Sequence, residues 1–404
     1  MKILVINTGS SSIKYRLFDM GDESILASGM IEKIGEAESR LAHVYRDAGG
    51  SWHDMAEDAP VADHRAGMAR IAALLTDADR GVVRDTSEIA AVGHRVVHGG
   101  EEFRGSAIIG DAVLEAIRAC VPLAPLHNPP NLTGIAVARE LFPDAPHAAV
   151  FDTAFHQTIP RHAFHYAIPR GLYEKHRVRR FGFHGTSHRY VAREAARVLG
   201  MPPVVANLIT IHLGNGASIT AVAGGKSVDT SMGMTPLEGL VMGTRCGDID
   251  PAVPFYLARN TGMSLDGIEN ILNKESGLKG LCGMNDMREV MRRRSEGGAN
   301  AQLAVEMYTY RIKKYIGAYL AVLGRAHAIV FTGGIGENAA EIRALSCRGL
   351  ESLGIAIDES KNASYLSGNT DVATPDSRVR ILIIPTNEEL EIARQTRDLL
   401  EKNK

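Results

Sequence analysis

Two short turns in this sequence are rich in Gly, Asn and Ser, and each follows a run of apolar residues. The first turn, Asn7–Ser12, follows Ile3–Ile6, and the second, His212–Ser218, follows Asn207–Ile211. Glycine allows a close approach to the backbone, whose N–H groups bind anions, and the serine hydroxyls add donors. Lys14, just beyond the first turn, adds a positive charge suited to phosphate. One such turn is more often an ordinary hairpin turn, but the pair predicts a nucleotide held at two phosphate contacts.

A third glycine-rich segment follows the apolar run Ala328–Phe331. It contains Gly334, Gly336 and Ala339 in the spacing of a dinucleotide-binding fingerprint. A dinucleotide-binding domain needs several further βα units, and only a short tail follows this segment. We therefore interpret it as a nucleotide contact at the N-terminus of a helix, with a dinucleotide oxidoreductase as an alternative.

Arginine and histidine residues in three further segments are candidates for binding a carboxylate or a phosphoryl group. Arg95 and Val97 lie two residues apart in a predicted strand and so share one face of it. A guanidinium beside an apolar side chain suits a small carboxylate with a short alkyl tail. His184 and Arg245 lie beside glycines, where such side chains often reach a ligand. Taken singly, each of these residues more often has a structural role, such as a surface ion pair.

Two acidic pairs raise the question of a bound metal. Asp248 and Asp250 precede Pro251 and lack the glycine of an EF-hand loop, so we expect turn residues or helix caps. Glu388 and Glu389 begin the last predicted helix, where carboxylates suit the positive end of the helix dipole. That position is compatible with one of the two glutamates also holding a metal ion.

The composition indicates a globular protein of more than one domain. The 404 residues are 45% hydrophobic and 23% charged, with a net charge of −2, and nothing points to nucleic acid or an anionic membrane. The first apolar run is too short for a signal peptide, and no run approaches the ~20 residues of a membrane helix. Four widely spaced cysteines predict reduced thiols in the cytoplasm.

Apolar patterning predicts alternating strands and helices that place the candidate residues at strand ends and helix starts. Each of the two polar turns is expected to join the strands of a hairpin, and the recurrence of this hairpin predicts an internal duplication. Residues 30–60 are expected to be irregular, and residues 123–131 to form a loop fixed by three prolines. Helices are expected at residues 63–77, 111–120 and 300–324, and a strand that ends at Asp152.

Taken together, these segments resemble the acetate kinase family from one end of the chain to the other. The stretches that carry the resemblance are Asn7–Lys14, His94–Gly100, Leu126–Asn131, Phe151–His156, Phe181–Tyr190, His212–Ser218, Gly243–Pro251, Thr332–Asn338 and Thr386–Glu389. The resemblance implies a duplicated α/β fold of the actin-like, sugar-kinase-like (ribonuclease H-like) type, with two lobes around a nucleotide cleft. The implied N-terminal lobe is residues 1–152 joined by the C-terminal helix 386–404, and the implied nucleotide-binding C-terminal lobe is residues 153–385.

The resemblance also implies roles for individual residues. The residues similar to the family's magnesium site are Asn7 and Glu388, and those similar to its catalytic residues are Asp152, His127 and the two transition-state stabilisers His184 and Arg245. The implied acetate pocket consists of the carboxylate anchor Arg95 and, around the methyl group, Val97, Leu126, Phe183 and Pro236. The implied nucleotide contacts are Ser10, Ser12, Lys14, His212, Leu213, Gly214, Asn215, Gly216, Asp286, Met287, Arg288, Gly334, Ile335, Gly336, Glu337 and Asn338.

The activity implied by the resemblance is reversible phosphoryl transfer from ATP to acetate, which gives acetyl phosphate and ADP. The expected cofactor is Mg²⁺, with Mn²⁺ as a substitute, and the expected partner is a second copy of the chain in a cytoplasmic homodimer, without nucleic acid or membrane. One alternative is a kinase of propionate or another short-chain acid, although Val97 favours the smallest acid because an alanine there would open the pocket. An actin-like ATPase that serves assembly is a further alternative, and it would have no use for Arg95 beside Val97.

Overall fold

The computed structural model describes residues 1–47 and 49–402, and the contacts within it divide the chain into two compact units. The first unit consists of Met1–Phe155 and Asn387–Lys404, and the second of His156–Thr386. The assignment of residues 1–152 with 386–404, and of residues 153–385, to two separate domains stays a prediction. Each unit is described by itself below.

A mixed sheet forms the centre of the first unit, in the order β5-β4-β3-β2-β1-β6-β8-β7. Its strands are β1 (Lys2–Thr8), β2 (Ser12–Asp19), β3 (Ser24–Glu32), β4 (Arg40–Arg46), β5 (Trp52–Asp58), β6 (Ile89–Val96), β7 (Ala107–Ile108) and β8 (His147–Phe151). The helices of this unit are α1 (His64–Leu75), α2 (Asp111–Ala119), α3 (Asn128–Leu141) and α15 (Glu388–Lys402).

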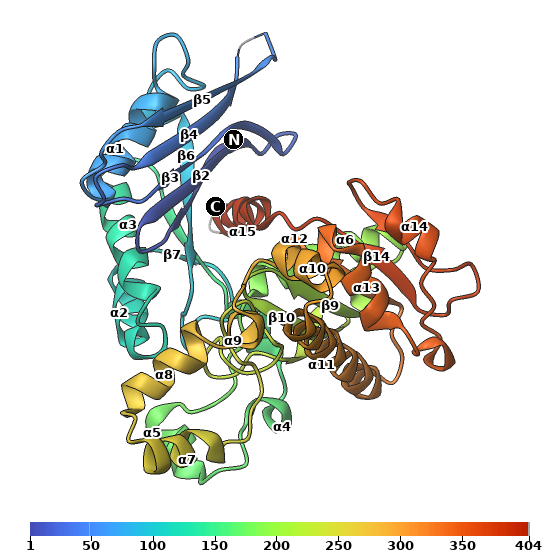
Figure 1. Ribbon diagram of the computed structural model, residues 1–404. Coiled ribbons are helices and arrows are strands. Elements are labelled where there is room, and N and C mark those ends of the chain that lie inside the picture. Colours follow the sequence, from blue (N-terminus) through green and yellow to red (C-terminus); the bar gives the residue numbers. More distant parts are fainter. Residues whose placement is uncertain (48, 403–404) are drawn as a thin grey trace. The chain divides into compact units, whose positions relative to one another are not determined.

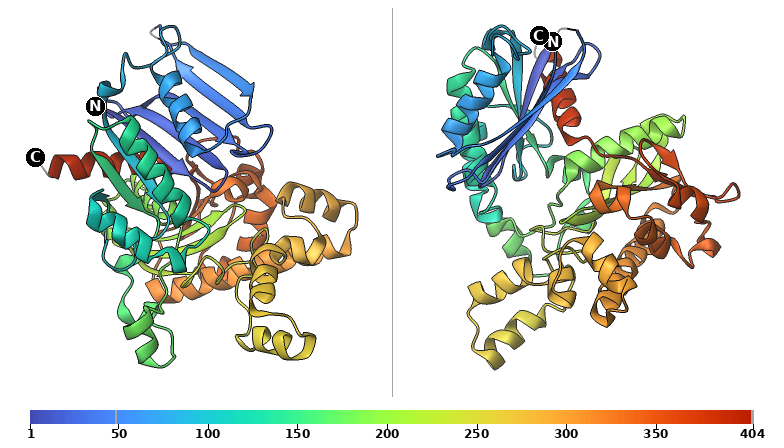
Figure 2. Two further views of the ribbon diagram at one scale, coloured as in Figure 1. Left: turned by 90° about the vertical axis from the view of Figure 1, so that its left-hand side faces the viewer. Right: turned by 45° about the horizontal axis from the view of Figure 1, so that its top comes forward.

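Helices cover both faces of this sheet. α1 and α3 pack on one face over a core that includes Leu4, Ile6 and Met68, and α15, the last helix of the chain, packs on the other face against β1, β6 and β8. The right-hand view of Figure 2 shows α15 in red on the opposite side of the strands from the blue and green helices. The alternation of buried Tyr15 and exposed Lys14 in β2 follows from this arrangement, because strand side chains point to opposite faces.

The second unit contains a smaller mixed sheet, in the order β11-β10-β9-β12-β14-β13 (Figure 1). Its strands are β9 (Asn207–Leu213), β10 (Ala217–Ala223), β11 (Lys226–Thr230), β12 (Ala328–Thr332), β13 (Thr370–Asp371) and β14 (Arg380–Ile383). Its helices are α4 (Arg161–Phe164), α5 (Arg170–His176), α6 (Gly185–Val198), α7 (Ala252–Thr261), α8 (Leu265–Lys274), α9 (Gly277–Cys282), α10 (Met287–Ser295), α11 (Ala299–Leu323), α12 (Gly333–Asn338), α13 (Ala340–Cys347) and α14 (Glu359–Ala363). Helix α6 packs on β9 and β12, and the long α11 packs on β9 and β10.

The two sheets share one topology, which confirms the predicted duplication. In the first unit the strands β3-β2-β1-β6-β8 run antiparallel across the hairpin and then parallel from β1 to β8. The strands β11-β10-β9-β12-β14 repeat both the order and the directions in the second unit. The hairpin in each sheet also excludes the all-parallel sheet that a dinucleotide-binding domain would need.

Two expectations about local structure were wrong. Residues 30–60 are not irregular, because β3, β4 and β5 run through them. The side chains of the edge strand β5 are mostly exposed, so its sequence lacks the apolar alternation that marks a half-buried strand. The expected proline loop at residues 123–131 ends early, since α3 begins at Asn128 with Pro129 and Pro130 in its first turn, where backbone N–H groups have no partner within the helix.

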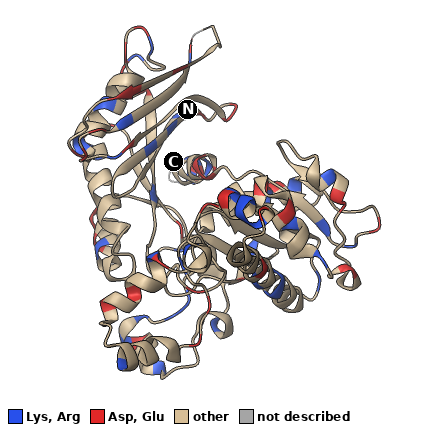
Figure 3. Cartoon of the chain, viewed as in Figure 1, with Lys and Arg blue, Asp and Glu red and all other residues tan. Residues whose placement is uncertain are grey.

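Charges of both signs are interspersed along the two units (Figure 3). Several of them form ion pairs within one helix, as Arg292 does with Glu289 and Glu296 on α10. Within the described part of the chain, no helix is both long enough and apolar enough to cross a membrane.

Candidate active site

The predicted site residues fall into two sets, one in each unit. In the first unit, the turn between β1 and β2 closes with a hydrogen bond of 2.8 Å from the Gly9 N–H to the Ser12 carbonyl. Ser10 is exposed, and Lys14 on β2 is exposed directly across from the half-buried Asn7 on β1. Asn7 and Lys14 are cross-strand partners, so their side chains lie on the same face of the sheet. Arg16, on this face, bonds to Asn387 at the start of α15 at 3.1 Å.

An arginine and two acidic residues gather at the ends of the parallel strands of this sheet. Arg95 on β6 donates from Nη2 to Asp152 Oδ2 at 2.7 Å, and Asp152 is 1% exposed directly after β8. The Nε of Arg95 is buried, lies 3.9 Å from Glu388 Oε2, and has no hydrogen-bond partner among the described residues. A buried guanidinium with an unused N–H is suited to an incoming carboxylate.

Glu388, the first residue of α15, lies in surroundings that disfavour its charge. Burial raises the pKa of Glu388 to about 7, and the neighbouring carboxylates of Asp152 and Glu389 act in the same direction, whereas Arg95 and Lys14 oppose the shift. A cation placed beside these carboxylates would relieve the repulsion between them.

The oxygen atoms of Asn7, Asp152 and Glu388 are of the type that Mg²⁺ prefers. Over residues 1–47 and 49–402, no group of three or more His, Cys, Asp or Glu side chains is arranged to hold a metal. A site with few protein ligands is compatible with Mg²⁺, which keeps several waters and binds substrate phosphates. The residues present therefore fit this ion.

Two buried asparagines at the start of α3 bond this helix to the segment that follows β6. Val97, 4% exposed, donates its N–H to Asn131 Oδ1 at 3.1 Å, and Asn131 Nδ2 donates to the carbonyl of Thr8 at 2.8 Å. Asn128 bonds to both the N–H and the carbonyl of His98 in the same way. Both asparagines lie in the stretch Leu126–Asn131 that carries the family resemblance, but the sequence did not identify them as supporting residues. Their hydrogen bonds and their burial became apparent only in the structure.

The remaining predicted residues of this set lie just before α3. Leu126 is exposed, with 63% of its surface accessible, and His127 is half-buried at the position before the first helical residue. Their parts in the acetate pocket and in catalysis stay predictions.

In the second unit, His184, His212 and Arg245 meet around a glycine. His184 precedes α6 with φ 56°, its Nδ1 lies 2.8 Å from Ser218 Oγ, and its ring stacks on that of His212 with centroids 4.3 Å apart. A Cβ added to Gly216 would lie 3.3 Å from His184 Nε2 and 3.6 Å from Arg245 Nη1. Only a residue without a side chain leaves this small volume open between an imidazole and a guanidinium.

A cavity of about 740 Å³ lies next to this glycine turn. The predicted nucleotide residues that line it are Gly214, Asn215, Asp286, Met287, Arg288, Gly334, Ile335 and Asn338. The lining residues that were not predicted are Asn285, Met291, Ala339, Ala340 and Glu341. Met291 follows Met287 by one helical turn of α10, a spacing that could have indicated a shared apolar wall.

Five of the predicted nucleotide residues in the second unit do not line the cavity. His212, Leu213 and Gly216 belong to β9 and its turn, and Gly336 is buried in α12. Glu337 Oε1 accepts from the backbone N–H groups of Gly333 at 3.0 Å and Thr386 at 3.2 Å, so it braces the start of α12.

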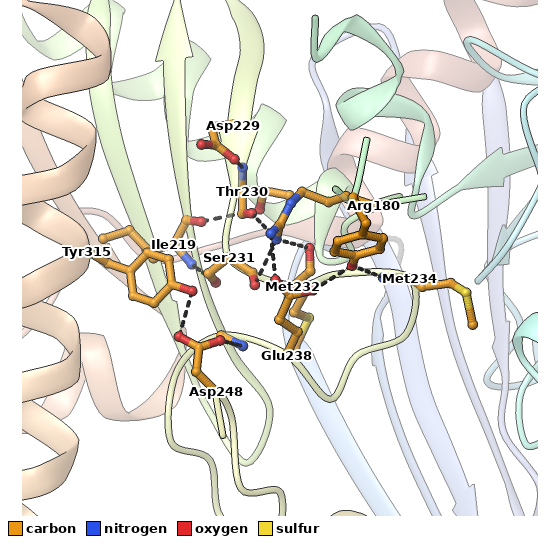
Figure 4. A network of polar contacts seen from close by, with 12 residues as sticks. Arg180, Ile219, Asp229, Thr230, Ser231, Met232, Met234, Glu238, Asp248 and Tyr315 are labelled. Carbon is orange, nitrogen blue, oxygen red and sulfur yellow. Dashed lines mark hydrogen bonds and ion pairs between the residues drawn. The ribbon is translucent and has the colours of Figure 1, made fainter. Parts of the chain in front are cut away.

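The loop that carries Pro236 and Arg245 is fixed by a network of partly buried charges (Figure 4). Arg180 Nη1 donates to three successive carbonyls, the nearest being Thr230 at 2.7 Å, and Arg180 Nη2 bonds to Glu238 at 2.6 Å. Tyr166 bonds to the other oxygen of Glu238 at 2.5 Å. These contacts fix both sides of Pro236, which is itself half-buried.

A second group of contacts holds the far end of the same loop. Asp248 accepts from the Gly239 N–H at 2.8 Å and from Tyr315 at 2.9 Å, and Arg311 donates to the Gly239 carbonyl at 2.8 Å. Asp248 is therefore the turn residue that its sequence context predicted, and Asp250 lies in the turn before α7, where it accepts from the Ala252 N–H at 2.8 Å. Phe183, by contrast, is buried before α6, with its carbonyl 2.9 Å from His156 Nε2.

Replacing Arg180 by methionine should destabilise the second unit. The substitution keeps most of the apolar stem but leaves Glu238 and three carbonyls without their donor, which should lower the free energy of unfolding by about 3 kcal/mol. The control is Arg197→Met, since Arg197 is 69% exposed and pairs with Glu194 on the surface of α6. Urea titration should show that the control loses less than about 1 kcal/mol of its free energy of unfolding. Equal losses in both variants would contradict a stabilising role for the network.

The chain is similar over its whole length to known proteins of one family. The acetokinase family matches residues 2–394. The acetate kinase of Syntrophobacter fumaroxidans is 55% identical over 401 residues, which cover 98% of this chain and 96% of that protein.

Two solved structures have the same fold over nearly their full lengths. The acetate kinase of Porphyromonas gingivalis is 43% identical with a TM-score of 0.92, and the alignment covers 99% of both chains. A propionate kinase of Francisella tularensis is 44% identical with a TM-score of 0.91, and the alignment covers 98% of this chain and 99% of that one. From the family match and this degree of identity, the chain belongs to the acetokinase family.

Proposed function

We propose that this protein transfers the γ-phosphoryl group of ATP to acetate, reversibly and in one in-line step, to give acetyl phosphate and ADP. The observation that carries the proposal is Arg95, whose buried Nε has no hydrogen-bond partner in the described chain, together with the buried apolar Val97 two residues further along, just after β6. A small carboxylate with a short apolar tail matches both features. Membership of the acetokinase family supports the same reaction.

The chemistry requires no general base. A carboxylic acid is already ionised at pH 7, so an acetate oxygen can attack the γ-phosphorus directly. One P–O bond forms to acetate while the bond between the γ-phosphorus and the bridging oxygen of ADP breaks. The protein must therefore supply positioning and stabilise the negative charge on the transferred group.

We assign these tasks to the predicted residues as follows. Arg95 anchors the carboxylate, and Asp152 orients Arg95 through the bond of 2.7 Å. His184 and Arg245 donate to the oxygens of the transferred phosphoryl group. The nucleotide lies in the cavity lined by α10 and α12, where the backbone N–H groups at the N-terminus of α12 suit phosphate.

Asn7 and Glu388 would hold the metal, and Ser10, Ser12 and Lys14 would contact phosphate. Mg²⁺, for which Mn²⁺ would substitute, neutralises phosphate charge when it is bound. We propose a cytoplasmic location for this activity, supported by its need for ATP and by four cysteines that form no disulfide.

Propionate is the second candidate substrate, because one of the similar solved structures is a propionate kinase. Val97→Ala should enlarge the pocket around the methyl group, and one methylene in an apolar pocket is worth about 1–3 kcal/mol. We expect the ratio of propionate to acetate kcat/KM to rise at least about 10-fold, measured by ADP release. An unchanged ratio would show that Val97 does not line the pocket. If the wild-type enzyme were more active on propionate than on acetate, propionate would be the substrate.

Arg245→Ala should lower kcat by at least about 10³-fold while the KM values for ATP and acetate change much less. The reason is that a donor to the phosphoryl group in flight acts mainly in the transition state. Added guanidine should restore part of the rate. Arg197→Ala, at an exposed position on α6, is the matched control and should keep wild-type kcat. A loss confined to the KM for ATP would instead make Arg245 a ground-state nucleotide contact.

We also propose that the protein is a homodimer, as the family resemblance implies. An apolar patch on α7 and α8 supports this proposal, since α7 has no buried residue and Phe255, Tyr256 and Leu265 are 58%, 64% and 70% exposed. Light scattering should give twice the chain mass of 43.5 kDa, and Leu265→Glu should reduce it to one chain. Leu303→Glu, at an exposed position on α11, is the control and should leave the dimer intact. If Leu265→Glu also left the dimer intact, the interface would not include this patch.

A further inference from the structure

A chain of hydrogen bonds joins two histidines, one at and one in the start of α6, to two hydroxyls, one on β9 and one on β10. Thr210 Oγ1 lies 2.8 Å from His188 Nδ1, and His188 Nε2 lies 2.7 Å from Ser218 Oγ. The same Ser218 Oγ lies 2.8 Å from His184 Nδ1. Thr210, His188 and Ser218 are all 0% exposed, so each hydrogen in the chain needs a partner inside the protein.

The hydrogens of this chain can be arranged in two directions. A hydroxyl has one hydrogen, and a neutral imidazole has one N–H group and one acceptor nitrogen. In the outward direction, Thr210 donates to His188, His188 donates to Ser218, and Ser218 donates to His184 Nδ1. In the inward direction every bond is reversed. His184 Nδ1–H donates to Ser218, Ser218 donates to His188 Nε2, and His188 Nδ1–H donates to Thr210.

Thr210 decides between the two directions. Its hydroxyl has no hydrogen-bond partner except His188 within the described residues. In the inward direction the hydroxyl hydrogen of Thr210 would be buried without an acceptor, which costs about 1–3 kcal/mol. A protonated His188 would leave the same hydrogen unpaired, and burial holds the pKa of His188 well below its usual value. Only the outward direction satisfies every group.

We propose that Thr210, His188 and Ser218 are positioning residues that fix the tautomer of His184. Because His184 Nδ1 accepts a hydrogen bond from Ser218, the hydrogen of the neutral ring lies on Nε2. His184 is thereby a donor at Nε2 without carrying a positive charge.

The position of His184 Nε2 gives this tautomer a consequence for catalysis, and that consequence rests on the proposed function. His184 Nε2 and Arg245 Nη1 border the same small volume, at 3.3 Å and 3.6 Å from the position of a Cβ on Gly216. An N–H group at Nε2 stabilises charge that develops in this volume, whereas a lone pair there would repel it. The chain of hydrogen bonds therefore decides whether His184 stabilises or repels negative charge that develops in this volume.

The test is to remove the hydroxyl that decides the direction, which is separated from His184 by two other residues, Ser218 and His188, in the hydrogen-bond chain. Thr210→Val has nearly the same shape but no hydroxyl, and Thr210→Ser restores the hydroxyl. Thr220→Val is the matched control, because Thr220 is the cross-strand partner of Thr210, is also 0% exposed, and bonds to Thr230 instead. The readout is the pair of ¹⁵N shifts of the His184 ring in labelled protein, with the signal assigned by its loss in His184→Gln.

Wild type, Thr210→Ser and Thr220→Val should show a single Nε2–H tautomer of His184. Thr210→Val should show a mixture, and an equal mixture would lower kcat about 2-fold at unchanged KM values. In Ser218→Ala, which breaks the chain, adding Thr210→Val should cause no further change in the His184 signals.

Wild-type shifts in Thr210→Val, or equal disturbance by Thr220→Val, would overturn the proposal. The shifts are measured without substrate, so they test the proposal independently of the reaction. A changed tautomer with an unchanged kcat would support the hydrogen-bond chain and would remove His184 from the proposed reaction.

Discussion

The balance of buried charge at the end of β6 and β8 is the constraint on which the first unit depends. Arg95 and Asp152 neutralise each other at 2.7 Å, but Glu388 remains as a further, half-buried carboxylate. A charge in such surroundings is costly unless a counter-ion or a substrate completes the set. A cation beside Glu388 and a carboxylate beside Arg95, as proposed above, would each pair with a charge that this region leaves unbalanced.

Much of this arrangement could be predicted from the sequence because it depends on backbone pattern. The turns at Asn7–Ser12 and His212–Ser218 are recognisable from composition, and both join the strands of hairpins in sheets with one shared topology. Gly334 was correctly expected near the start of a helix, since a glycine turn after an apolar strand leaves few alternatives. Resemblance to a family then supplied roles that pattern alone could not give, such as those of Asp152 and Glu388.

Other features could not be predicted, for two physical reasons. The strands between residues 30 and 60 lie toward the edge of a sheet, where one-sided burial weakens the apolar alternation that reveals a strand. The supporting residues Asn131, Arg180 and Ser218 act through hydrogen bonds to segments far away in the sequence. Such bonds depend on the completed fold, so a polar residue that will be buried looks the same in sequence as one that will be exposed.

The position of α15 has a consequence for how the protein is made. This helix follows the whole second unit in the sequence, yet it packs on β1, β6 and β8 and supplies Glu388 to the first unit. During synthesis, β1, β6 and β8 leave the ribosome long before α15, so one face of these strands lacks its cover until α15 has been made. The second unit is one continuous segment, from residue 156 to residue 386, so its fold requires no later part of the sequence. The first unit therefore completes its fold only after the second unit has been synthesised, and its uncovered apolar face must be protected from aggregation in the meantime.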